Sequence, residues 1–308
     1  MKTSNTKTKV ITLGLVLAFM TISAHAQVTS SDVLDSVLQR YQSAASGWAA
    51  SITGAASWLF WTLAVISMVW TFGMLALKKA DIGEFFAEFL RFTIFTGFFW
   101  WLLSNGPAIA TAIMDSLRQV GSRASGLPST LSPSGIVDVG FEIFDKVVDQ
   151  SSFWSPVNSA VGIIMAAVVL VILALVAVNM LLLLVSGWVL AYGGVFFLGF
   201  GGSRWTSDMA INYYKTVLGI AAQLLVMVLI VGIGRTFLDD YYGRMSQGIT
   251  IKEMGVMMIV SIILLMLTNK LPGLVSGIIT GAPSVTPESV TLALVPLLVQ
   301  QASQRLVL

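Results

Sequence analysis

The sequence predicts an all-α, polytopic helical membrane protein with about five transmembrane helices. Hydrophobic residues make up 56% of the 308 residues and charged residues only 10%, whereas soluble domains carry about 25% charged residues. The mean hydropathy of +0.87 agrees with this class. Residues 157–202 also form one run without a charged residue or a histidine. This run is about twice as long as the ~20 residues that one helical span needs.

Residues 1–26 have the features of a secretory signal peptide. Lys2, Lys7 and Lys9 form a basic region, an apolar stretch too short to span follows, and Ala-His-Ala stands before Gln27 as a cleavage site. Cleavage there would leave fourteen basic and fifteen acidic residues, and it would remove His25, the single histidine. The mature N-terminus is then expected in the periplasm. An uncleaved first anchor is the alternative.

The residue types that remain exclude several kinds of chemistry. The chain has no cysteine, and after cleavage it has no histidine. The commonest ligands of zinc, copper, haem and iron–sulfur clusters are therefore missing. Thiol nucleophiles, histidine-based triads and disulfides are missing as well. The sequence thus predicts a protein that is not an enzyme and that carries no cofactor and no metal.

The first half of the chain is expected to combine amphipathic and spanning helices. Residues 27–56 are predicted to form a periplasmic amphipathic helix, because apolar residues recur on one face. Residues 57–114 are predicted to hold the first two spans, 57–77 and 92–114, joined by an elbow helix in the membrane interface at 80–92. Asn105-Gly106-Pro107 is expected to kink or break the second span. Residues 115–156 then form a periplasmic loop followed by an amphipathic helix at 138–149.

Residues 157–281 are predicted to form the main transmembrane core. The apolar run becomes rich in glycine towards its end, and further spans follow at 216–234 and 254–268. Residues 269–281 are predicted to be a break followed by a half-helix of small residues, and residues 282–308 a C-terminal tail. The glycines of the run and the turn-forming residues of the half-helix are Gly187, Gly193, Gly194, Gly199, Gly201, Gly202, Pro272, Gly273, Gly277 and Gly281.

The number of spans depends on whether residues 157–202 cross the membrane once or twice. One crossing gives five spans with seven basic residues inside and seven outside, and two crossings give six spans with six inside and eight outside. The positive-inside rule therefore favours five. In that arrangement the glycine-rich section is re-entrant or lies at the cytoplasmic face. No charged residue is expected inside a span, so an ion-coupled carrier would lack its usual carboxylates.

Arg204, Trp205 and Asp208 follow the last glycine of the run. Arg204 and Asp208 have the i, i+4 spacing that allows pairing on a short helix. They form either a substrate or gating site or, as the favoured interpretation, an anchor at the membrane interface. The glycines are expected to permit close approach of helices or subunits. No Lys-Ser/Thr follows them at the spacing of a phosphate-binding loop. All these residues are candidates for a structural role, an oligomer contact or a substrate path.

Residues 192–234, which begin YGGVFFLGFGGSRW, resemble the signature of the TrbL family. These are inner-membrane components of conjugative type IV secretion systems, related to the sixth VirB protein. The later NKLPGLVSGIITG is similar to the family's segment of proline followed by small residues, so the resemblance covers roughly residues 57–281. It implies an exported N-terminus with a signal, about five spans, a central periplasmic loop and oligomeric assembly in the bacterial inner membrane.

The resemblance also implies a function. The chain is expected to be a non-enzymatic scaffold and channel component of a conjugation apparatus, assembled as a homo-oligomeric ring. Its expected partners are further copies of itself, other secretion components including pilin and stalk proteins, membrane lipids, and DNA or protein substrate in transit. A small-molecule permease acting alone is the alternative from a different class. A membrane protein without a pore, acting in entry exclusion or structure, is a third.

Overall fold

The computed structural model describes residues 33–126, 132–149, 156–244 and 251–281, and all the secondary structure in these residues is helical. The expected signal peptide and C-terminal tail lie outside them. The elements in chain order are α2 (Val33–Leu77), α3 (Ile82–Ser104), α4 (Gly106–Ser125), α5 (Pro133–Asp149), α6 (Pro156–Gly193), the 3₁₀ helix η2 (Gly194–Gly202), α7 (Ser207–Arg244) and α8 (Ile251–Thr280).

Five of the described helical segments are long and apolar enough to cross a membrane. They are Leu34–Leu77, Ile82–Ser104, Ser159–Gly202, Ser207–Gly243 and Lys252–Thr280. The predicted all-α class with about five spans is therefore confirmed. The stretch from α6 through η2 is a single candidate span, which is the five-span alternative.

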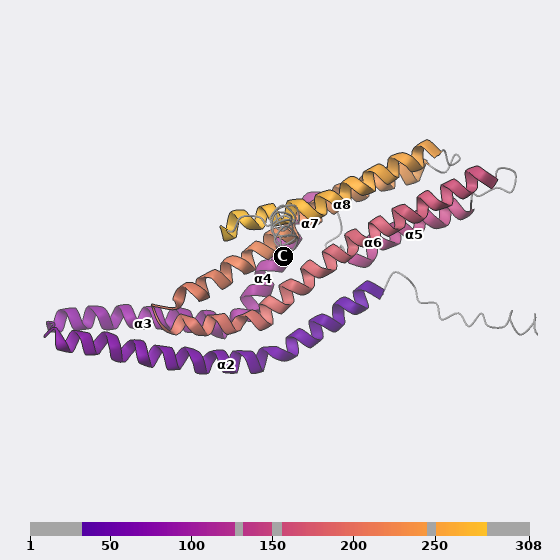
Figure 1. Cartoon of the computed structure of the whole chain (residues 1–308). Helices are drawn as coiled ribbons and strands as arrows, with labels where there is room; N and C mark the ends of the chain where they lie inside the picture. The colour runs from indigo at the N-terminus through magenta and orange to yellow at the C-terminus, as the bar shows by residue number, and fades with distance from the viewer. Residues whose placement is uncertain (1–32, 127–131, 150–155, 245–250, 282–308) are drawn as a thin grey trace, which may run out of the picture.

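The molecule is elongated (Figure 1). α2 and α3 form a hairpin at one end, while the pairs α5–α6 and α7–α8 extend towards the other. α2 has 45 residues, which corresponds to about 68 Å of helix and exceeds the ~30 Å hydrocarbon core more than twofold. The helices therefore extend well beyond one bilayer thickness.

The tip of the hairpin is a tight turn after Leu77. Lys79 has φ 53°, a left-handed conformation, and the Asp81 carboxylate accepts a hydrogen bond of 2.8 Å from the Ile82 N–H. Below the turn, Phe72 of α2 packs against Phe85, Phe89 and Phe92 of α3, with ring centroids 5.1, 6.2 and 6.0 Å away.

No helix ends at the compositional changes around residues 56 and 92. α2 continues from the expected amphipathic helix into the first span without interruption. The change from polar to apolar composition there includes no proline, and a helix tolerates a single glycine such as Gly54. The expected elbow helix is likewise the first part of α3, because nothing breaks the helix between its Asp81 N-cap and Asn105.

The expected break at Asn105 is present, and α4 begins directly after it with Pro107 in its first turn. The second span is thus Ile82–Ser104 rather than 92–114. α4 occupies part of the expected loop and ends where Gly126 adopts φ 71°.

Two expectations in the second half are also corrected. The polar stretch after residue 234 belongs to α7, which continues to Arg244. No break divides α8 at Asn269, because the helix continues through Pro272 to Thr280. It ends at Gly281, which has φ 69° and donates its N–H to the Gly277 carbonyl at 2.9 Å. This is the left-handed C-terminal cap that glycine favours.

α7 is the most buried of the five candidate spans. α4 and α8 both pack on it, and glycines mark the closest contacts. A Cβ at Gly121 of α4 would lie 3.0 Å from the Leu225 carbonyl oxygen of α7, and one at Gly234 of α7 would lie 2.6 Å from the Leu264 side chain of α8. α7 is therefore the central helix against which the rest of the core is positioned.

Candidate functional site

The glycine-rich end of the long apolar run forms a 3₁₀ helix. α6 is apolar on all sides and α-helical up to Gly193, and η2 then continues for nine residues from Gly194 to Gly202. Most 3₁₀ helices are no longer than three or four residues. With three residues per turn, residues three apart lie on one face. η2 therefore presents three distinct faces, and the chain reverses only after it. The segment is therefore not re-entrant, and the other alternative, a position at the cytoplasmic face, stays a prediction.

The first face of η2 lies against the backbone of α2. A Cβ at Gly199 would lie 2.7 Å from the Ala56 carbonyl oxygen. One turn later, a Cβ at Gly202 would overlap the Phe60 carbonyl oxygen and lie 3.2 Å from the Ala64 nitrogen. Since residues four apart on α2 meet residues three apart on η2, the two helices lie side by side in backbone contact. Only glycine permits this approach.

The second face of η2 packs against α3 and the start of α4. Val195 and Leu198 are fully buried, and they lie where a Cβ at Gly106 would meet their methyl groups at 3.3 and 2.8 Å. On the same face, a Cβ at Gly201 would lie 2.5 Å from the Phe99 ring of α3. η2 therefore fills the angle between α2 and α3.

The remaining glycines of the run have different surroundings. A Cβ at Gly187 would lie 2.7 Å from the Met114 sulfur of α4, and one at Gly194 would lie 2.8 Å from the Tyr213 ring of α7. Gly193 has no neighbouring atom within 4 Å of its Cβ position. The glycines are therefore not equivalent, and Gly193 is free of packing constraint.

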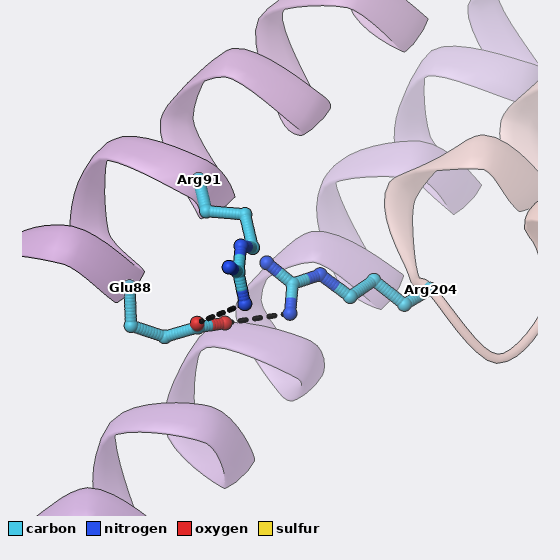
Figure 2. A network of polar contacts seen from close by, with 3 residues as sticks. All are labelled: Glu88, Arg91 and Arg204. Atoms are coloured by element: carbon cyan, nitrogen blue, oxygen red, sulfur yellow. Dashed lines mark hydrogen bonds and ion pairs between the residues drawn. The ribbon is translucent and has the colours of Figure 1, made fainter. Parts of the chain in front are cut away.

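The turn after η2 carries an ion pair to α3 (Figure 2). Arg204 donates a hydrogen bond of 2.6 Å from Nη1 to Oε1 of Glu88, and Arg91 reaches the other oxygen, Oε2, at 3.3 Å. The Arg204 guanidinium also lies 5.9 Å from the centre of the Phe95 ring. One carboxylate thus holds two arginines from different elements.

The Glu88–Arg204 pair is partly shielded from solvent. The Glu88 side chain is 16% exposed and that of Arg204 34%, whereas Arg91 is 73% exposed. Nη2 of Arg204 is buried and has no hydrogen-bond partner in the described part of the chain. Because shielding from water strengthens the attraction and makes an unpaired charge costly, Arg204 depends on Glu88.

This pairing corrects two expectations. Arg204 pairs with Glu88, not with Asp208, which is exposed in the first turn of α7. Glu88 and Arg91 also lie on α3, within the candidate span Ile82–Ser104, and not on a separate interfacial helix. Glu88 was missed as a site residue because it precedes Arg204 by 116 positions, and no local spacing connects them.

The other predicted residues lie at two places. Trp205 is 63% exposed and meets Trp70 of α2 edge-on, with ring centroids 5.7 Å apart. The segment with Pro272, Gly273 and Gly277 belongs to α8, which packs on α7: a Cβ at Gly219 would lie 2.8 Å from Ser276 Oγ. The structure therefore brings Gly199, Gly201, Gly202, Arg204 and Trp205 together at the hairpin and assigns the α8 residues to a different contact.

Two amide side chains connect α6 and α8. Nδ2 of Asn179 donates a hydrogen bond of 2.8 Å to the side-chain amide oxygen Oδ1 of Asn269. Hydrogen bonds between apolar helices contribute to association where hydrophobic driving force is weak. In the described residues, no group of three or more acidic, histidine or cysteine side chains is arranged to hold a metal ion.

These features define a multi-pass helical membrane protein in which a glycine-rich 3₁₀ segment fixes a helical hairpin to a helical core. The family model described as TrbL/VirB6 plasmid conjugal transfer protein matches residues 64–271, and the chain belongs to this family. The chain is 30% identical over 273 residues to "Probable conjugal transfer protein TrbL" of Sinorhizobium fredii (strain NBRC 101917 / NGR234), covering 86% of this chain and 68% of that protein. It is 31% identical over 281 residues to "Conjugal transfer protein TrbL" of Rhizobium radiobacter, covering 87% of this chain and 70% of the relative.

Family membership makes the chain a component of a conjugative type IV secretion system. The family consists of structural parts of the transfer apparatus and is not a known enzyme family. The five apolar helices fit a multi-pass protein of the bacterial inner membrane. These findings confirm the resemblance read from residues 192–234.

Proposed function

We propose that the chain is a non-enzymatic scaffold and channel component of the conjugation apparatus, assembled as a homo-oligomeric ring in the inner membrane. The observation that supports this most is the excess length of its helices. α2, α6 and α7 have 45, 38 and 38 residues, which is about 57–68 Å each against the ~30 Å hydrocarbon core. Helices of this length reach beyond the membrane, where pilin and stalk proteins can assemble on them.

The exposed surface supports an oligomer. Large apolar side chains are exposed on both helices of the hairpin, including Trp58, Val69, Leu77, Ile82 and Ile94, at 72, 68, 80, 73 and 70%. In a membrane these side chains meet lipid tails or a neighbouring copy. A ring of copies encloses a central path through which DNA or protein substrate passes, and hydrolysis of ATP belongs to partner proteins.

Gene deletion tests the proposed role. A strain without the gene should lose plasmid transfer while nicking of plasmid DNA at the transfer origin continues, and the intact gene supplied separately should restore transfer. Normal transfer from the deletion strain would overturn the proposal. Crosslinking of the complemented protein in membranes tests the ring, which predicts a ladder of homo-oligomers; crosslinks only to other proteins would contradict it.

The proposed topology places the mature N-terminus in the periplasm after cleavage at Ala26, with five crossings and a cytoplasmic C-terminus. The chain has no cysteine, so single substitutions Ser246→Cys and Ser303→Cys give unique labels. A membrane-impermeant thiol reagent should label the first from outside the cell and leave the second unlabelled. The opposite pattern would support six crossings and overturn the proposed topology.

A further inference from the structure

A groove on the surface of the molecule separates α3 from α7. It has a volume of about 670 Å³, and its walls, which include Phe98 and Leu102 of α3 and Ile211 and Leu218 of α7, are almost entirely apolar. The two helices scarcely pack against each other. Tyr214 of α7 joins them by a hydrogen bond of 3.2 Å from its hydroxyl to the Leu102 carbonyl. Apolar side chains of both helices are therefore left uncovered, with Phe98 54% and Ile211 43% exposed.

The wall formed by α7 carries a positive charge. Lys215 lines the groove and its side chain is exposed, and no carboxylate in the described part of the chain lies within ion-pair distance of its amine. On the same helix, Asp208 lies seven residues earlier, which is about two turns. An apolar groove with a cation at its edge suits an apolar segment that carries one acidic residue.

The chain leaves α8 beside this groove. A Cβ at Gly219 of α7 would lie 2.8 Å from Ser276 Oγ and 3.2 Å from Thr280 Cγ2 of α8, and Gly219 directly follows the groove residue Leu218. α8 ends at Gly281, whose φ of 69° directs the chain out of the helix. The residues that follow Gly281 therefore start next to the α7 wall of the groove.

The sequence after Gly281 has the composition that this groove requires. Residues 282–308 lie outside the described residues, and they begin APSVTPESVTLALVPLLV. Residues 290–299 carry no charge and are too short to cross a membrane, which takes ~20 apolar residues. An apolar run of this length needs a protein surface or a membrane interface to cover it. Glu288, the one acidic residue of 282–308, stands two positions before the run.

We propose that residues 290–299 pack into the α3–α7 groove of their own chain, with Glu288 beside Lys215. The connection has eight residues, 282–289, and reaches up to ~26 Å when extended, so it easily spans from Gly281 to the groove. Docked there, the segment contacts both α3 and α7. It thereby fixes the hairpin to the core at a place where these two helices scarcely pack. The proposal concerns the folded chain and does not rest on the channel role.

A second apolar groove, between α7 and α8, supplies a matched control. It has a volume of about 330 Å³, and its lining residues, among them Ile233 and Leu267, carry no charge. Ile233 is 60% exposed, so it is at least as accessible as Ile211 on the same helix. Leu267 lies fourteen residues before Gly281, about 21 Å along α8. The residues after Gly281 therefore start at a distance from this second groove.

Disulfide formation in isolated membranes tests the proposal on the full chain, which has no cysteine of its own. Ile211→Cys places one thiol in the α3–α7 groove. Ala293→Cys, Leu294→Cys and Val295→Cys, each combined with it in turn, place the second thiol in the proposed segment. Consecutive residues point in different directions, so one of the three faces the groove whichever way the segment lies. A disulfide forms where the two Cα atoms are about 4.4–6.8 Å apart.

Oxidation with copper phenanthroline should link Ile211→Cys to at least one of the three tail thiols within a single chain. The protein then stays monomeric on a denaturing gel, and mass spectrometry identifies the linked peptides. Ile233→Cys combined with the same tail thiols should remain unlinked. Equal linkage of both groove positions would overturn the proposal, and so would no linkage of Ile211→Cys, which leaves lipid as the occupant. A dimer band would place the tail of another copy in the groove and would equally overturn it.

The proposed ion pair is tested in the double-cysteine variant that links best. Lys215→Glu should lower the linked fraction about two- to fivefold, the effect expected of an exposed ion pair. Glu288→Lys added to Lys215→Glu should restore the yield. Lys252→Glu, the same change at the far end of α8, is the control and should leave the yield unchanged. An unchanged yield in Lys215→Glu, or a loss that Glu288→Lys does not restore, would contradict the pairing of Glu288 with Lys215.

Discussion

Replacement of Gly202 by alanine should destabilise the protein, whereas the same replacement at Gly193 should not. A Cβ at Gly202 would overlap the Phe60 carbonyl oxygen of α2 and lie 3.2 Å from the Ala64 nitrogen, but at Gly193 it would have no neighbour within 4 Å. Both obstacles at Gly202 are backbone atoms of a regular helix. They cannot rotate away as a side chain can, so η2 and α2 must move apart.

The size of the difference follows from two opposing terms. Alanine in place of glycine in a helix gains about 1 kcal/mol where space is free. Overpacking at a close contact costs about 1–3 kcal/mol, with backbone obstacles at the upper end. Gly202→Ala should therefore lower the free energy of unfolding by about 2 kcal/mol, and Gly193→Ala should raise it by up to about 1 kcal/mol. At ~2–4 °C per kcal/mol for chains of this size, the two melting temperatures should differ by roughly 6–12 °C.

Thermal unfolding of the purified variants in one detergent, followed by size-exclusion chromatography of heated samples, measures this difference. Gly201→Ala is a second comparison, because its obstacle is the Phe99 ring rather than backbone. Adding Phe99→Leu should recover most of the stability of Gly201→Ala, but Phe60→Leu should not rescue Gly202→Ala, since the carbonyl stays in place. Equal melting temperatures for Gly202→Ala and Gly193→Ala would refute the close packing of η2 on α2.

Two further predictions concern polar contacts between helices. Glu88→Gln should lower the free energy of unfolding by about 1–3 kcal/mol, below the 3–5 kcal/mol typical of fully buried pairs, because Arg204 remains partly exposed. Arg91→Gln is the control and should leave the melting temperature unchanged, because that side chain is 73% exposed; an equal loss in both variants would contradict the assignment. Asn179→Leu should cost roughly 0.5–1.5 kcal/mol because it leaves the Asn269 amide without its partner. Asn179→Leu combined with Asn269→Leu should recover that loss in the same melting assay, and no recovery would indicate a different role.

Much of the fold could be predicted from composition and helix signals. Charge-free length indicated five spans, although the second begins at Ile82 rather than at residue 92, and Asn105-Gly106-Pro107 identified the break between α3 and α4. α6 begins at Pro156, because proline suits the first helical position. A change of composition without a breaking residue does not end a helix, as within α2 at residue 56 and within α3 at residue 92. A change in polarity reports what surrounds a helix, and only capping or breaking residues end it.

The site was harder to predict because its geometry is not local. The glycines suggested close helix approach. Nothing in the sequence, however, distinguishes Gly202, which packs against α2, from Gly193, which has no neighbouring atom within 4 Å of its Cβ position. The 3₁₀ geometry that places Gly199 and Gly202 on one face has no clear sequence signal. Helical spacing predicts Asp208 as the partner of Arg204, because it is the nearest carboxylate along the chain. In the structure Arg204 pairs with Glu88 on α3.

The contacts of its residues explain the motif GFGGSRW, which covers residues 199–205. Gly199 and Gly202 meet α2, Gly201 meets α3, Arg204 pairs with α3, and Trp205 meets the aromatic side chain of Trp70 on α2. Five of these seven successive residues thus alternate between the two helices of the hairpin. An α-helix would rotate these contacts by 100° per residue and would direct them away from two fixed neighbours, but a repeat of three returns each contact to the same side. The 3₁₀ winding of η2 therefore allows one short segment to contact both helices of the hairpin and α7.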